Sequence, residues 1–296
     1  MIERSFELTI KSDIMKKILV PTDFSDNATN AIRYAVYLYK DVECTFYLLH
    51  TYSPAIYQAE YVLHSPGQIG LGDIYLENSL TQLNALKNKL IEEFGNKKHT
   101  FEVHAAFNLL VDEILKVSQA EHIDLVIMGT QGATKAKEIL IGTNTVHVIK
   151  KACCPVIAIP PNFQYEKPKE ILFPTDYEIE YQETQLKELL HIGKEHISCI
   201  EVLHVSTGYE LNESQLAHKK KLTGIIGKIA HLFHDMPNQE VISAINGFQQ
   251  KKRVNMLVMI QNKHSFLERM FLKPIINSLG FHIKIPFMVI PPHKDN

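Results

Sequence analysis

Glycines and a threonine with a distinctive spacing follow an apolar run in the first half of the chain. Residues 124–128 are apolar after an initial Asp and lead into Gly129 and Gly132, and nine residues then separate Gly132 from Gly142 and Thr143. Glycine lets a ligand approach the backbone closely, and a glycine that opens a helix precedes a first turn with free N–H groups. This arrangement is typical of a phosphate site, although a helix-entry turn could need glycine for its backbone angles alone.

The composition of the chain favours a globular protein of two domains. It has 296 residues, of which 45% are hydrophobic and 22% charged, and a net charge of −2. There is no basic excess for nucleic-acid binding and no apolar run of the ~18 residues that a membrane helix needs. Residues 1–14 contain no apolar core of a secretory signal, so we expect a cytoplasmic protein. We interpret these residues as an N-terminal extension, with Met15 as a possible true start.

The cysteines and histidines indicate no metal site. Cys44, Cys153, Cys154 and Cys199 lack a Cys-x-x-Cys spacing. They are expected to be reduced, buried thiols. The 15 histidines form no compact ligand spacing with cysteines or carboxylates along the sequence.

Apolar strands alternate with amphipathic helices along the first half. Strands are predicted at residues 17–20, 44–50, 99–105, 124–128 and 155–159, and helices at 26–39, 73–94, 109–120 and 142–151. This alternation is typical of an α/β fold with a parallel sheet covered on both faces. Ligands of such sheets bind beyond the carboxyl ends of the strands, so the loops at 21–23 and 50–52 should meet the glycine segment. Residues 53–71 are predicted to form a long loop.

The same pattern then occurs a second time. Residues 171–176 repeat 18–23, residues 202–205 repeat 48–51, and residues 285–291 repeat 154–160. We therefore predict a domain at 15–160, a linker at 161–168 and a second domain at 169–296. Pairing Pro155 with Pro286 places large residues at all glycine positions of the motif: Ile260 opposite Gly129, Lys263 opposite Gly132, and Lys273 opposite Gly142. The second domain is thus predicted to be a copy without a ligand.

With these motifs the chain resembles the universal stress protein family in its tandem two-domain form. The pattern Gly-x2-Gly-x9-Gly-Thr is similar to that of the ATP-binding branch of the family. The resemblance implies two open five-stranded parallel sheets with helices on both faces, ATP with Mg²⁺ in the first domain, and dimers formed by pairing of the fifth strands. The residues that it assigns to the nucleotide are Pro21, Thr22, Asp23, Thr51, Met128, Gly129, Gly132, Gly142, Thr143, Asn144 and Thr145.

The resemblance also implies which part of the nucleotide each residue contacts. Asp23 lies near the nucleoside, and the backbone of Thr51 faces adenine, at a position where the family often has Val. Met128 and Gly129 lie beside the ribose and phosphates, and the residues around the triphosphate are Gly132, Gly142, Thr143, Asn144 and Thr145. We expect the loop at 133–141 to close over ATP.

The function expected from the sequence is regulatory or stress-protective binding of ATP by the first domain. The second domain would act as a dimer partner within the chain, and the whole chain is expected to form a homodimer. One rival is a slow ATPase, autokinase or nucleotidyl transferase, although no Gly-x4-Gly-Lys-(Ser/Thr) loop is present and no catalytic residue is predicted. A second rival is an interaction module that binds no nucleotide.

Overall fold

The computed structural model describes residues 15–52, 71–130, 142–206, 210–237, 239–261 and 284–292. The strands are β1 (Lys16–Pro21), β2 (Cys44–Thr51), β3 (His99–Ala106), β4 (Leu125–Gly129), β5 (Val156–Ile159), β6 (Glu170–Thr175), β7 (Cys199–Ser206), β8 (Ala230–Pro237), β9 (Met256–Ile260) and β10 (Phe287–Ile290). The helices in these ranges are α1 (Asp26–Leu38), α2 (Leu71–Phe94), α3 (Leu110–Ala120), α4 (Thr143–Lys151), α5 (Glu183–His196), α6 (Glu213–Ile226) and α7 (Val241–Lys251).

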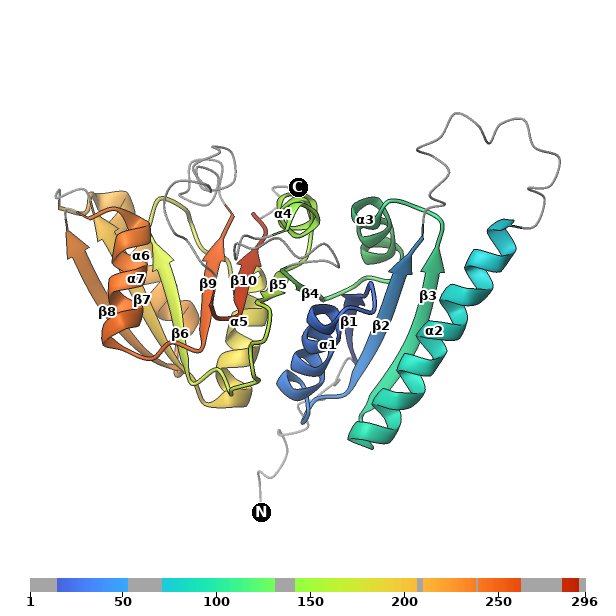
Figure 1. Ribbon diagram of the computed structural model, residues 1–296. Coiled ribbons are helices and arrows are strands. Elements are labelled where there is room, and N and C mark those ends of the chain that lie inside the picture. Colours follow the sequence, from blue (N-terminus) through green and yellow to red (C-terminus); the bar gives the residue numbers. More distant parts are fainter. Residues whose placement is uncertain are drawn as a thin grey trace, which may run out of the picture.

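The strands form a single ten-stranded sheet in the order β3-β2-β1-β4-β5-β10-β9-β6-β7-β8. Each half of this order has the same sequence of pairings, read outward from the centre. The halves meet where β5 and β10 pair antiparallel, with Ile157 opposite Met288, whereas the pairings within each half are parallel. Figure 1 shows β5 and β10 side by side near the middle of the molecule. None of the described helices is long and apolar enough to span a membrane.

Alternate strand residues feed two apolar cores on opposite faces of the sheet. Ile18 packs into one core and Leu19 into the other, and both are fully buried. The first core takes buried side chains from α1, α2, α5 and α6, and the second takes them from α3, α4 and α7. This double cover explains the continuous apolar runs of the strands and confirms the predicted α/β class.

The sheet register confirms the internal repeat at the end of the glycine strand. Gly129 of β4 lies opposite Ile159 of β5, and Ile260 of β9 lies opposite Ile290 of β10. Each residue of the second pair thus lies 131 positions after its counterpart in the first pair (260 − 129 and 290 − 159). Ile260 occupies the place of Gly129 in the second half, as the ungapped sequence pairing predicts.

Two expectations about buried residues are wrong in part. Apolar residues recur along the sequence at Ile225, Ile226, Ile229, Leu232 and Phe233, which predicts core packing. Ile226 and Ile229 lie in the core, but the chain then passes into the outer strand β8, where Leu232 is 51% exposed. The cysteines were expected to be buried, yet Cys153 is exposed and Cys199 only partly buried. Cys153 precedes β5, where the chain has left the regular elements, so strand periodicity does not describe it.

Candidate functional site

The carboxyl ends of three neighbouring strands define the candidate site. β1 lies between β2 and β4 in the sheet, although β4 comes much later in the chain. The chain proceeds from β1 to β2 and β3 on one side and then crosses to β4 on the other, so the strand order reverses at β1. Open α/β sheets bind ligands at this kind of reversal.

The loop after β1 is tied to the end of β2 by hydrogen bonds. The N–H of Thr22 donates to the carbonyl of Leu49 at 2.7 Å, and Nδ1 of His50 donates to the carbonyl of Thr22 at 2.8 Å. Thr22 is buried, and its hydroxyl accepts a bond from the N–H of Phe24 at 3.0 Å. Phe24 has a φ of 62°, an uncommon value for an aromatic residue, and its ring packs 4.6 Å from that of His50. The predicted residues Pro21 and Thr22 therefore hold the loop in place.

Asp23 stands at the exposed tip of this loop. Its Oδ1 accepts a hydrogen bond from the N–H of Ser25 at 3.1 Å, and Ser25 in turn caps α1 by accepting from the N–H of Ala28 at 3.2 Å. These bonds fix the carboxylate of Asp23 at the entrance to α1. Thr51, the last residue of β2, is half-buried beside the loop.

Gly129, the last residue of β4, lies against the first turn of α1. A Cβ at this position would come within 2.5 Å of Asn27 Nδ2 and 2.9 Å of Asn27 Cγ. A side chain here would have to displace the Asn27 amide, and its Cβ would also lie 3.3 Å from the Asn27 carbonyl oxygen, so glycine suits this position even without a ligand. Met128, the preceding residue, is buried in the sheet. Sequence analysis missed Asn27, because only the strand order places the start of α1 beside the end of β4.

The start of α4 is anchored to the end of β4. The N–H of Gly142 donates to the carbonyl of Thr130 at 2.5 Å, and the hydroxyl of the buried Thr145 donates to the carbonyl of Gly129 at 3.0 Å. The first bond of the helix ladder runs from the N–H of Val146 to Gly142 at 3.0 Å. The N–H groups of residues 143–145 therefore have no acceptor within the helix, and they start at the switch point of the sheet.

The exposed residues at the start of α4 are accessible to a ligand, whereas the buried ones hold the helix in place. Thr143 and Asn144 are exposed, so their side chains are accessible to a ligand, whereas Thr145 is buried and fixes the helix. Thr130 adds a hydroxyl that is buried and, among the described residues, has no hydrogen-bond partner. The sequence pattern did not single out Thr130, because only the fold shows that this hydroxyl is enclosed.

The structure brings together ten of the eleven predicted residues. Pro21 ends β1, and Thr22 and Asp23 follow it; Thr51 ends β2, and Met128 and Gly129 end β4. Beside β4, Gly142 caps α4, whose first residues are Thr143, Asn144 and Thr145. Gly132 and the loop at 133–141 lie outside the described residues, as do the extension at 1–14, most of the loop at 53–71, Lys263 and Lys273.

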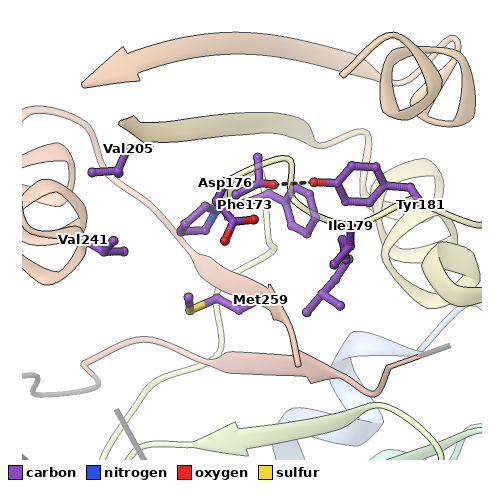
Figure 2. Close-up of a pocket in the computed structure, with 10 residues that line it drawn as sticks. Phe173, Asp176, Ile179, Tyr181, Val205, Val241 and Met259 are labelled. Carbon is purple, nitrogen blue, oxygen red and sulfur yellow. Dashed lines mark hydrogen bonds between the residues drawn. The ribbon is translucent and has the colours of Figure 1, made fainter. Parts of the chain in front are cut away.

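The second half keeps the shape of the first loop but fills the site differently. Tyr177 follows the repeated Thr-Asp pair with a φ of 57°, and its N–H donates to Thr175 Oγ1 at 3.1 Å, as Phe24 does to Thr22. The hydroxyl of Thr175 is also hydrogen-bonded to that of Tyr181, a fully buried side chain. Figure 2 shows Tyr181, Phe173 and Met259 around the space that remains.

This space is a cavity of about 60 Å³ at the carboxyl ends of β6, β7 and β9. Ile260, at the place of Gly129, and the neighbouring Met259 lie on its wall. Small-molecule sites commonly have volumes of ~300–1,000 Å³, several times larger. At this place the described residues of the second half therefore leave much less space than a small-molecule site usually has.

Comparison with known proteins identifies the family of the chain. The profile of the universal stress protein family matches residues 15–160. A universal stress protein of Methanocaldococcus jannaschii is 35% identical over 161 residues, which cover 50% of this chain and 96% of the relative. A second one from the same organism is 30% identical over 159 residues, covering 53% of this chain and 86% of the relative. The chain belongs to the universal stress protein family.

A solved structure extends the likeness to the tandem fold. The crystal structure of a universal stress protein from Archaeoglobus fulgidus DSM 4304 superposes with a TM-score of 0.67, and the match covers 95% of this chain and 97% of that one. The sequences are 19% identical, so this match concerns the fold. Together with the half-length relatives, it identifies the chain as a tandem universal stress protein.

Proposed function

We propose that this tandem universal stress protein binds ATP with Mg²⁺ in its first half and acts as a cytoplasmic regulatory or stress-protective protein. The observation that carries the proposal is the anchoring of α4 at the switch point. Bonds from Gly142 and Thr145 hold the start of α4 against the end of β4, and three N–H groups there have no acceptor within the helix. A triphosphate supplies acceptors and negative charge for such a helix start.

The surrounding residues fit the rest of a nucleotide. The carboxylate of Asp23 lies beyond the end of β1. There it would accept a hydrogen bond from a ribose hydroxyl or bind a Mg²⁺ ion held by the phosphates. Thr51 presents its backbone at the end of β2, and Thr143 presents an exposed hydroxyl for a phosphate. The protein would bind and orient the nucleotide with these groups, and the proposal assigns none of them to a catalytic step.

Calorimetric titration with MgATP tests the proposal. We expect one nucleotide per chain and a higher melting temperature on addition of MgATP, because binding to the folded state stabilises it. The cavity of about 60 Å³ in the second half is the reason for expecting one site rather than two. Mass spectrometry of any nucleotide released on denaturation identifies the ligand independently.

Substitution at the start of α4 sharpens this test. Thr143→Val removes an exposed hydroxyl that would donate a hydrogen bond to a phosphate. A hydrogen bond to a charged group contributes about 1.5–3 kcal/mol, so we expect the affinity for MgATP to fall roughly tenfold or more. Thr184→Val is the matched control, because Thr184 is an exposed residue in the first turn of α5 in the second half. Absence of binding and of any thermal shift at millimolar MgATP would refute the proposal, and steady-state turnover lost in Asp23→Ala would favour the enzyme instead.

We further propose that the second half acts as the dimer partner of the first within one chain. The support is the antiparallel pairing of β10 with β5, which uses the strand edge that the family resemblance assigns to dimers. A homodimer of the whole chain, also expected from the sequence, would then need a different surface. Light scattering of the full chain measures this: a mass of 33.9 kDa means that the chain alone is the unit, and twice that value means a homodimer.

A further inference from the structure

A cluster of potential metal ligands lies on the second half of the sheet, away from the nucleotide site. Glu170 begins β6, and Cys199 and Glu201 lie on β7, with Glu170 directly opposite Cys199 in the register. One ligand atom from each of these three side chains lies within 4.8 Å of the others, and Cys199 Sγ is 3.3 Å from Glu201 Oε1. Thiolate, carboxylate and imidazole are the usual ligands of zinc in proteins.

The next strand adds an imidazole to the cluster. His234 of β8 is hydrogen-bonded through Nε2 to Glu201 Oε2, and it is about a third exposed (32%). Glu170 is also partly exposed (30%), whereas the Glu201 side chain is fully buried. An ion entering from solvent would therefore meet two accessible ligands in front of a buried carboxylate.

A single ammonium group bridges the two carboxylates of this cluster. Lys252, just after α7, is hydrogen-bonded to Glu201 Oε1 and lies 3.1 Å from Glu170 Oε2. The cluster thus has two carboxylates and the single ammonium group of Lys252 between them. Two carboxylates, one of them fully buried, favour the arrival of a second positive charge.

The first half of the chain shows what the fold itself requires here. Lys17 lies opposite Thr45 in the register of β1 and β2, as Glu170 lies opposite Cys199 in the register of β6 and β7. There Lys17 pairs with Glu121 at 3.9 Å, just after α3. The same ion pair therefore occurs in both halves with its charges exchanged. The first half has Thr45 at the place of Cys199, so the fold does not require a thiol there.

We propose that Cys199, Glu201 and His234, with Glu170 as a fourth ligand, form a binding site for Zn²⁺ or a similar divalent transition-metal ion. Tetrahedral ligands at about 2.3 Å for sulfur and 2.0 Å for oxygen lie roughly 3.3–3.6 Å apart, which matches the Cys199–Glu201 separation of 3.3 Å. Binding transfers the thiol proton of Cys199 to solvent, and His234 binds through a ring nitrogen without a proton, with the proton of the neutral imidazole on its other ring nitrogen. It also displaces Lys252, a partly exposed side chain that can turn to solvent.

Zinc titration against a chromophoric chelator, without nucleotide, tests the proposal. We expect one site per chain in the native protein and its loss in Cys199→Ser. Lys252→Met removes the competing charge and should bind Zn²⁺ at least tenfold more tightly. Cobalt in place of zinc should show a thiolate charge-transfer absorption band in the native protein and in Lys252→Met, but not in Cys199→Ser.

Two matched variants control for general effects. Cys153→Ser removes an exposed cysteine elsewhere, and Lys251→Met removes an exposed lysine next to Lys252, so neither should change zinc binding. Equal binding by the native protein and Cys199→Ser would mean an adventitious ion only, held by other histidines, and would overturn the proposal. So would the absence of zinc binding in both the native protein and Lys252→Met. Neither result would affect the test of ATP binding.

Discussion

The buried side chain of His196 joins the two halves and makes the free energy of unfolding depend on pH. Its Nε2 donates to the carbonyl of Leu38 at 2.9 Å, so the end of α5 is bonded to the end of α1. Burial, assisted by the nearby Lys167, lowers the pKa of His196 below its usual value of 6.5. The neutral imidazole is therefore the form that the folded protein prefers.

A pH dependence of stability follows from this preference. Below pH 6.5 the unfolded chain takes up a proton at His196 that the folded protein does not, so the free energy of unfolding falls as the pH falls through this region. His196→Gln should reduce this slope, because an amide can still donate to Leu38 but does not titrate. Urea denaturation at several pH values measures it, with His147→Gln, at an exposed histidine, as the control. An unchanged slope in His196→Gln would contradict the argument.

The candidate nucleotide site can be recognised from the sequence more readily than the proposed metal cluster. Gly129, Gly142 and Thr143 were recognisable because their spacing along the chain carries the pattern. The members of the metal cluster come from three strands, and their separations along the sequence follow no motif. Only the side-chain contacts across the paired strands β7 and β8 show that Cys199 and His234 approach the same carboxylate, that of Glu201.

Helix α5 is joined to β1 by a buried polar network. Lys16 of β1 and Glu188 of α5 form an ion pair, and the hydroxyl of Tyr39 donates to the same carboxylate. All three side chains are buried, so each charge depends on its partner for compensation. The network fixes the position of α5 against the first half of the molecule.

Breaking this network from one side should be costly. Glu188→Ala leaves Lys16 buried without its counter-ion, and we expect a loss of about 3–5 kcal/mol in the free energy of unfolding. The double variant Lys16→Met with Glu188→Met should recover most of it, because no buried charge remains. Urea denaturation of the single and double variants measures the coupling between the two residues.

The exposed pair of Arg33 and Glu93 is the control for this experiment. It joins α1 to α2 by two hydrogen bonds of 2.8 and 3.0 Å. Because both side chains are accessible to water, Glu93→Ala should cost no more than about 1 kcal/mol. Equal losses in Glu93→Ala and Glu188→Ala would show that burial does not determine the strength of the pair.

Most elements could be predicted from sequence periodicity, and the reason is visible in the fold. Strands covered on both faces are apolar throughout, so β4 and β5 were readily found. The strand β8 at the end of the sheet has only intermediate and exposed residues, and there the prediction of a core stripe failed at Leu232. Periodicity in the sequence identifies a strand but does not show how much of that strand is buried in the fold.

The ten-stranded sheet should make the whole molecule unfold as one unit. The cores on both faces continue from one half to the other, and β5 and β10 share their hydrogen bonds. We expect one denaturation transition, detected equally by hydrogen exchange in β2 and in β7, and a stabilisation of both by MgATP if the first half binds it. Two separate transitions, with only that of β2 shifted by nucleotide, would show that the halves are independent.

The pairing of β5 with β10 also makes association of the two halves independent of protein concentration. Two separate chains that meet at such an edge come apart on dilution, whereas two halves on one chain remain at a high effective concentration. The second half consequently needs no ligand of its own to stay beside the first. Positions of the second half that correspond to the candidate site of the first, such as Ile260 opposite Ile290, can therefore change without separating the first half from its partner.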